Sequence, residues 1–295
     1  MITFIKNFAK RKISGLVDVS KIQDLASKSY IDSLVRESEK KLLKHQIATK
    51  WSIIDAFERM TQPQTTQKTH CPFCEQEYLN QNENKLTSNC IFGGGVLIRY
   101  QCPNCDVIYG PNKMLSLTEK ELSQEYEWHY SVYEEGDSTN LEIKAFYALE
   151  PSKDKVYLNY GGGAWSKSLE ILRKDGWQVY CYEPHAHIDH DQEFVIKNRE
   201  SLSMMKFDGI FSNNVLEHFR FPVAELKDML SLLKQDGKMA HATPCYEYAF
   251  EFTRFHLFFF TGRSKNLLWN KAGLRPLNFT QDGVFMCQVL EAIDK

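Results

Sequence analysis

From residue 154 onward, short apolar segments alternate with longer amphipathic ones. The short apolar segments predict strands, and apolar positions spaced three and four residues apart predict helices. The predicted strands are Lys155–Tyr160, Trp177–Glu183, Phe207–Asn213 and Lys238–Thr243, and the predicted helices are Ser166–Lys174, Val223–Lys234 and Lys265–Ala272. This alternation is typical of an α/β, doubly wound, mostly parallel sheet with helices on both faces.

The end of the chain departs from this alternation. Two apolar segments, Leu274–Thr280 and Val284–Ile293, are joined by Gln281-Asp282-Gly283 alone. A connection this short forces its strands to run antiparallel. The sequence therefore predicts a parallel sheet that ends in an antiparallel hairpin.

The first half of the chain divides into smaller units. Ser20 to about Met60 is predicted to be helical, because Ser20 and Gln23 form a capping-box pattern and apolar residues then recur at helical spacing. A polar linker follows at Thr61–Thr69. We expect a helical arm over 1–64, a small cysteine module over 65–112, a helical and aromatic connector over 113–153, and the α/β domain over 154–295.

Composition and charge exclude several classes of protein. Hydrophobic residues make up 43% of the 295 residues, which excludes a disordered chain. The net charge of −2 provides no positive field to attract nucleic acid. No apolar run is long enough for a transmembrane segment. Met1–Leu16 is basic and lacks the apolar core of a secretory signal, so weak contact with a membrane surface is its minority interpretation.

Four of the eight cysteines form two matching pairs, Cys71-Pro-Phe-Cys74 and Cys102-Pro-Asn-Cys105. Two such turns each present a pair of thiolates to one tetrahedral ion, which predicts a structural Zn²⁺ in a small zinc ribbon. The alternative interpretation is four free thiols. Thiolate ligation suits a reducing compartment, so we expect a cytoplasmic protein. We assign no role to the other cysteines or to His70.

A glycine turn, Gly161-Gly162-Gly163, follows the first predicted strand and precedes a helix. Glycines there let the backbone approach a ligand closely. Glu183 stands at the end of the next strand, where an acid can accept hydrogen bonds from both hydroxyls of a ribose. Together they indicate a nucleoside ligand, and the alternative is a tight turn with an unrelated surface carboxylate.

These features, together with Asn213-Asn214-Val215-Leu216-Glu217-His218 and the downstream Thr243-Pro244 and Phe260-Thr261, resemble class I S-adenosylmethionine-dependent methyltransferases over about half the chain. The resemblance implies a Rossmann-like, seven-stranded sheet and a small-molecule acceptor, including sugars. It implies that the cofactor contacts Asn159, Gly161, Gly162, Gly163, Glu183 and Asn213. A metal-binding cysteine module before such a domain also resembles, in arrangement, the sugar C-methyltransferases of bacterial glycan and natural-product pathways.

Two positions differ from the usual pattern of that family. Asn159 stands where an aspartate is usual, and Trp165 stands where a third glycine is usual. Both substitutions favour the alternative of a non-catalytic binding or scaffold protein with a methyltransferase fold.

Methyl transfer to a hydroxyl or carbon acid requires a base beside the transferred methyl group. His218 is the first candidate, because the resemblance places it in the loop after the fourth strand. His256 is the second candidate, and Glu217 orients the loop or binds the acceptor. His241 is predicted to be a packed residue within a strand.

Two further clusters precede and follow the glycine turn. Tyr130 belongs to an aromatic group that closes over cofactor or acceptor, or else packs within a helix; the group is Tyr126, Trp128, His129, Tyr130 and Tyr133. A second metal site is the minority interpretation of a later histidine cluster, comprising His185, His187, His190, Asp189 and Asp191.

The favoured interpretation is a cytoplasmic methyltransferase of a small, carbohydrate-linked acceptor such as a nucleotide sugar. An RNA methyltransferase is less favoured, because Lys85 and Arg99 are the only cations between Cys71 and Cys105. The sequence leaves the acceptor, the methylated atom and the oligomeric state open.

Overall fold

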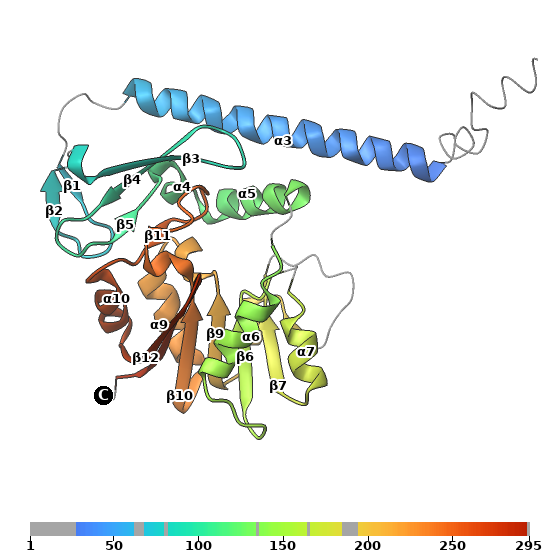
Figure 1. The fold of residues 1–295 in the computed structure, drawn as a ribbon, viewed down its shortest axis with the longest axis vertical. Coiled ribbons are helices and arrows are strands. Elements are labelled where there is room, and N and C mark those ends of the chain that lie inside the picture. Colours follow the sequence, from blue (N-terminus) through green and yellow to red (C-terminus); the bar gives the residue numbers. More distant parts are fainter. Residues whose placement is uncertain are drawn as a thin grey trace, which may run out of the picture.

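A computed structural model describes residues 28–61, 68–79, 82–133, 136–163, 166–184 and 194–293. Its larger part is a seven-stranded sheet of order β12-β13-β10-β9-β6-β7-β8 (Figure 1). The parallel strands are β6 (Val156–Tyr160), β7 (Gln178–Tyr182), β8 (Val195–Ile196), β9 (Phe207–Asn213) and β10 (Leu233–Ala242). β12 (Leu274–Asp282) and β13 (Phe285–Ala292) form the antiparallel hairpin. The predicted fold class is confirmed.

Successive side chains of the central strands enter two separate cores, as a pleated strand requires. One core contains Leu158, Ile210 and Met239, covered by α8 (Arg199–Ser203), α9 (Pro222–Leu232) and α10 (Ser264–Ala272). The other contains Tyr157, Phe211 and Ala240, covered by α6 (Thr139–Ala148) and α7 (Ser168–Lys174). The sheet is therefore doubly wound, and its apolar strands are buried on both faces.

The hairpin connection differs from its prediction. Gln281 and Asp282 belong to β12, where they pair with Met286 and Phe285. The turn consists of Gly283 and Val284, with Gly283 at a φ of 60°. The sequence-based boundary was wrong because a glycine in the left-handed region closes a two-residue turn, so the strands pair to the end.

The cysteine module contains two small sheets. β1 (Lys68–His70) and β2 (Glu77–Leu79) form one hairpin, and the short helix η1 (Asn82–Asn84) follows. The second sheet has the order β11-β5-β4-β3, made of β3 (Lys85–Asn89), β4 (Val96–Gln101), β5 (Ile108–Tyr109) and β11 (Phe258–Phe259). Because β11 lies between β10 and α10 in the sequence, the C-terminal half supplies one strand of the module.

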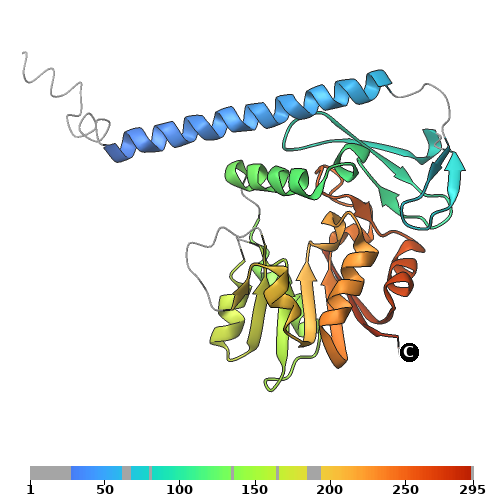
Figure 2. The same ribbon diagram turned by 180° about the vertical axis from the view of Figure 1, so that it is seen from behind.

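The long helix α3 (Lys28–Thr61) and the shorter α5 (Glu119–Val132) run side by side above the large sheet in both views (Figures 1 and 2). Buried polar contacts hold the second half of α3. The Trp51 indole nitrogen donates to Glu125 of α5 at 3.0 Å, and Asp55 forms a buried ion pair with Lys113 of α4 (Asn112–Leu115).

The first half of α3 has a different environment. Every residue from 30 to 42 is exposed, including the apolar side chains of Ile31, Leu34, Val35 and Leu42. Across the part of the chain that the structure describes, no helix has both the length and the apolar character needed to cross a bilayer.

Candidate functional site

The glycine turn follows β6 and needs glycine for two reasons. Gly161 and Gly163 have positive φ angles of 75° and 66°. A Cβ atom at Gly161 would lie 2.8 Å from Val215 Cγ2, and one at Gly162 would lie 2.8 Å from Cys181 Sγ. The turn therefore lies against β7 on one side and against the loop after β9 on the other, with no room for a side chain at Gly161 or Gly162.

Glu183 meets this turn at the carboxyl edge of the sheet. It follows β7, and its Oε2 atom accepts a hydrogen bond from the backbone N–H of Gly163 at 3.1 Å. A cavity of about 170 Å³ lies between them, lined in part by Asn159, Gly162, Gly163 and Glu183. Four of the residues predicted to contact a cofactor thus share one cavity.

The other three residues predicted to contact the cofactor do not line this cavity. Gly161 packs against Val215 at the start of the loop after β9. Asn213 is buried at the end of β9, and its Nδ2 atom has no partner among the described residues. Tyr130 is on α5, with its ring stacked 6.2 Å from that of Tyr126, and it does not line the cavity.

A second group of polar residues gathers in the loop after β9, at the short helix η2 (Leu216–His218). One carboxylate oxygen of Glu217 and one ring nitrogen from each of His218 and His256 lie within 4.8 Å of one another. The Tyr126 hydroxyl lies 3.1 Å from His218 Nδ1, and the His218 and His256 rings are 5.0 Å apart. The three predicted catalytic residues are therefore together.

Burial sets the charge of this group. It lowers the pKa of His218 to about 4, against the opposing effect of the Phe255 carbonyl. Burial, and then the proximity of His218, lower the pKa of His256 well below its usual value. Both rings are therefore neutral at pH 7, while the Glu217 carboxylate beside them is fully buried.

The tautomer of His256 follows from its contacts. Its Nδ1 atom lies 3.0 Å from the carbonyl oxygen of Phe250 and 3.5 Å from Cys245 Sγ. A carbonyl only accepts, so Nδ1 carries the proton and Nε2 keeps its lone pair. His241 has a different place: it is buried in β10, with Nδ1 2.8 Å from Ser212 Oγ, as its strand position predicts.

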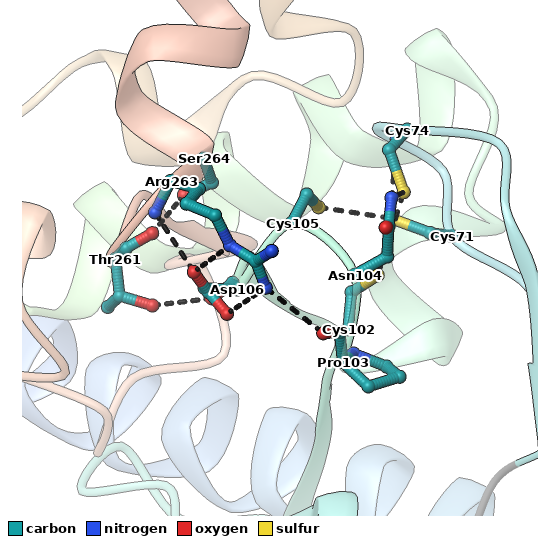
Figure 3. A network of polar contacts seen from close by, with 10 residues as sticks. All are labelled: Cys71, Cys74, Cys102, Pro103, Asn104, Cys105, Asp106, Thr261, Arg263 and Ser264. Atoms are coloured by element: carbon teal, nitrogen blue, oxygen red, sulfur yellow. Dashed lines mark hydrogen bonds and ion pairs between the residues drawn. The ribbon is translucent and has the colours of Figure 1, made fainter.

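The four cysteines of the two pairs converge at one point (Figure 3). Cys71 Sγ lies 3.7 Å from Cys105 Sγ, and Cys74 Sγ lies 3.6 Å from Cys102 Sγ. Four sulfur atoms bonded to one zinc ion at about 2.3 Å would be about 3.8 Å apart. Backbone N–H groups of Phe73 and Cys74 point at Cys71 Sγ at 3.4 Å, so the geometry and the donor set fit a tetrahedral metal ion.

The second cysteine turn is anchored to the C-terminal half. Arg263 Nε donates to Asp106 Oδ2 at 2.9 Å, and its Nη2 donates to the Pro103 carbonyl at 3.1 Å (Figure 3). Thr261 Oγ1 donates to the carbonyl of Asp106. The turn that carries Cys102 and Cys105 is therefore fixed to the start of α10.

Comparison with known protein families finds a match over most of the large sheet. Residues 132–278 match the family described as Methyltransferase domain. The matched segment covers just under half of the chain and contains β6–β10, the glycine turn and Glu183.

Solved structures of methyltransferases resemble the chain at low identity. The 1,6-didemethyltoxoflavin-N1-methyltransferase of Burkholderia thailandensis is 14% identical with a TM-score of 0.46, over 68% of this chain and 96% of that one. CcbJ of Streptomyces caelestis is 12% identical with a TM-score of 0.42, over 56% and 95%. The mitomycin 7-O-methyltransferase MmcR is 13% identical with a TM-score of 0.41, over 59% and 58%. No curated protein matches the chain.

The matched segment contains one residue near the glycine turn that sequence reasoning missed. Glu142, on α6, is buried beneath the glycine turn and accepts a hydrogen bond from Asn159 Nδ2 at 2.7 Å. Its position in an amphipathic segment gave no signal, because α6 packs against the sheet through contacts between residues far apart in the sequence.

Several predicted features lie outside the described residues. These are Trp165 of the glycine turn, the basic arm Met1–Leu16, the capping pair Ser20 and Gln23, and the cluster of His185, His187, His190, Asp189 and Asp191.

Proposed function

We propose that this chain is an S-adenosylmethionine-dependent methyltransferase of a small, carbohydrate-linked acceptor, with a structural zinc ion in its cysteine module. The main support for the proposal is that Glu183 and the glycine turn line the same cavity, within the segment that matches the methyltransferase family. The Glu183 carboxylate can accept hydrogen bonds from both ribose hydroxyls.

The residues at the turn fit this cofactor. The glycines leave the turn without side chains where a ligand would lie, and no atom lies within 4 Å of a Cβ built on Gly163. The Oδ1 atom of Asn159 is buried without a hydrogen-bond partner among the described residues, as expected of a group that binds a ligand. When bound, the sulfonium of the cofactor supplies the electrophilic methyl group.

His218 is the proposed base. Its neutral ring can take a proton from the acceptor, and the nearby Glu217 carboxylate stabilises the imidazolium that forms. His256 stands beside this pair with a free Nε2 lone pair and helps to bind the acceptor. Tyr126 of α5 contacts His218 in the same loop, and Tyr130 stacks on Tyr126; we expect this pair to contact the acceptor or cofactor.

The burial of a cationic side chain in the cysteine module favours a small acceptor over RNA. Arg99, one of two between Cys71 and Cys105, is fully buried, and its guanidinium donates to the carbonyl oxygens of Glu251 and Thr253 at 2.6 Å. It is therefore not available to a phosphate backbone. We propose a reducing, cytoplasmic location, because the four zinc ligands are needed as thiolates.

The role of His218 is tested by the variant His218→Ala. General-base catalysis contributes about a hundredfold or more, so turnover should fall by that factor while cofactor affinity stays within about twofold. Affinity is measured first, by calorimetric titration with S-adenosylhomocysteine, and turnover by transfer of a labelled methyl group to nucleotide sugars.

The control variant is His45→Ala, which removes an exposed histidine of α3 and should change neither quantity. A large loss of cofactor affinity in His218→Ala would mean that the residue fixes the loop, and would reject its catalytic role.

A further inference from the structure

Arg99 is a buried cation of the cysteine module that holds a segment outside the module. It lies on β4 and is fully buried. Its Nη1 and Nη2 atoms donate to the carbonyl oxygens of Glu251 and Thr253, each at 2.6 Å. Its Nη2 and Nε atoms also donate to the carbonyl oxygen of His256, at 3.1 and 3.3 Å. One side chain of the module therefore holds both ends of the turn formed by residues 251–256.

The charge of Arg99 makes these hydrogen bonds strong. Burial lowers the pKa of Arg99 from its ordinary value, but a guanidinium stays protonated in proteins, so its donors carry a positive charge. Hydrogen bonds from a charged donor are stronger than neutral ones, and a buried carbonyl that loses its donor costs free energy. The module therefore fixes the shape of this turn.

The same turn sets the orientation of the His256 ring. The ring reaches back across the turn, and its Nδ1 atom lies 3.0 Å from the carbonyl oxygen of Phe250. Arg99 holds the carbonyl of Glu251, next to Phe250, and the carbonyl of His256 itself. It thus fixes the two ends that this hydrogen bond joins. The bond keeps the proton on Nδ1 and leaves the Nε2 lone pair for the methyl acceptor.

The residues after His256 are held by the module as well. The backbone N–H of Gly110, after β5, donates to the carbonyl of Leu257 at 3.0 Å, and the N–H of Leu257 donates to the carbonyl of Glu217 at 2.7 Å. β11 follows, and it pairs with β5 where the module meets the rest of the chain (Figure 1). Leu257 therefore joins the module to the loop that carries Glu217 and His218.

We propose that Arg99 is a positioning residue for His256, and that the cysteine module is thereby part of the methyl-acceptor side of the site. Arg99 does not line the cavity beside Glu183, so its loss should disturb the acceptor side and leave cofactor binding intact. The inference rests on the proposed function, in which His256 helps to bind the acceptor.

The test reads the His256 ring directly, in the full chain purified with zinc present. Long-range ¹H–¹⁵N spectra of the histidine rings give the tautomer of each ring, and His256→Gln identifies the signals of His256. Calorimetric titration with S-adenosylhomocysteine gives the cofactor affinity. Elemental analysis and thermal unfolding show whether each variant keeps its zinc content and its fold.

Two variants change Arg99, and a third is the control. Arg99→Gln removes the charge, and Arg99→Lys keeps it with fewer donors. The control Arg263→Gln removes another arginine that ties the module to the C-terminal half, in this case through Asp106 and Pro103.

In the wild type, His256 should show the Nδ1–H tautomer. In Arg99→Gln, the ratio of the Nδ1–H form to the Nε2–H form should fall about fivefold or more, the effect of losing one hydrogen bond. Affinity for S-adenosylhomocysteine should stay within about twofold. Arg99→Lys should recover part of the ratio, and Arg263→Gln should leave both quantities unchanged.

A wild type with His256 in the Nε2–H form would overturn the inference without any variant, and so would an unchanged ratio in a folded Arg99 variant. An equal change in Arg263→Gln, or a parallel loss of cofactor affinity in Arg99→Gln, would show a general structural role and would overturn it too. Absence of S-adenosylhomocysteine binding by the wild type would instead reject the proposed function, while the tautomer of His256 would still test the positioning by Arg99.

Discussion

Burial keeps several histidines of this chain neutral. It lowers the pKa of His129 and His218 to about 4 and that of His241 to about 3. The unfolded chain would protonate these rings near pH 6.5, so between that pH and their folded pKa values the unfolded state binds more protons. The free energy of unfolding should therefore rise with pH across this window and fall on acidification.

His241 gives the cleanest test, because it lies in the middle of the sheet and touches neither the cavity nor the cysteines. Between pH 7 and pH 5.5, one such histidine lowers the free energy of unfolding by about 1 kcal/mol. Chemical denaturation should show that His241→Gln loses about that much less than the wild type over this interval. Identical losses in both proteins would mean that His241 is protonated in the folded state.

At the residue scale, the sequence predicts those functional side chains whose role follows from their spacing or position along the chain. Cys71, Cys74, Cys102 and Cys105 follow from their spacing, and Glu183 follows from its distance from the glycine turn. Glu142 does not, because its role depends on how α6 packs under that turn. The hydroxyl of Tyr126 likewise reaches His218 only through the packing of α5, although the aromatic cluster itself was visible.

At the scale of elements, the cysteine module is joined to the segment that matches the methyltransferase family. β11 pairs with β5, and buried Arg99 of β4 donates to the carbonyl oxygen of His256 as well as to those of Glu251 and Thr253. The two-residue β11 lies in an aromatic run that has no strand periodicity, so this pairing could not be predicted from the sequence.

Loss of the proposed zinc ion should therefore affect a defined set of segments. Elemental analysis should find one zinc ion per wild-type chain and none in Cys102→Ser. Hydrogen exchange should accelerate in that variant over residues 85–109 and 251–260, while β6, β9 and β10 keep their protection, because those strands lie inside the large sheet. Unchanged exchange in a zinc-free variant would contradict a structural role for the metal.

At the scale of the whole molecule, the alternation of strand and helix predicted the architecture well. Strands buried on both faces leave nearly continuous apolar segments, and the amphipathic segments between them predict the helices that a parallel sheet requires. The placement of α3 could not be predicted, since its contacts with α5 and α4 depend on Glu125 and Lys113, both distant in the sequence. The contact between the cysteine module and one end of the sheet could not be predicted either.

The edge formed by the glycine turn and Glu183 is proposed to bind S-adenosylmethionine. Calorimetric titration of the zinc-loaded chain with S-adenosylhomocysteine tests it most directly, alongside Glu183→Ala. We expect saturable binding at one site, weakened in the variant by about 1.5–3 kcal/mol, the usual contribution of hydrogen bonds to a charged group. Absence of binding by the wild type, or equal dissociation constants for wild type and variant, would contradict it.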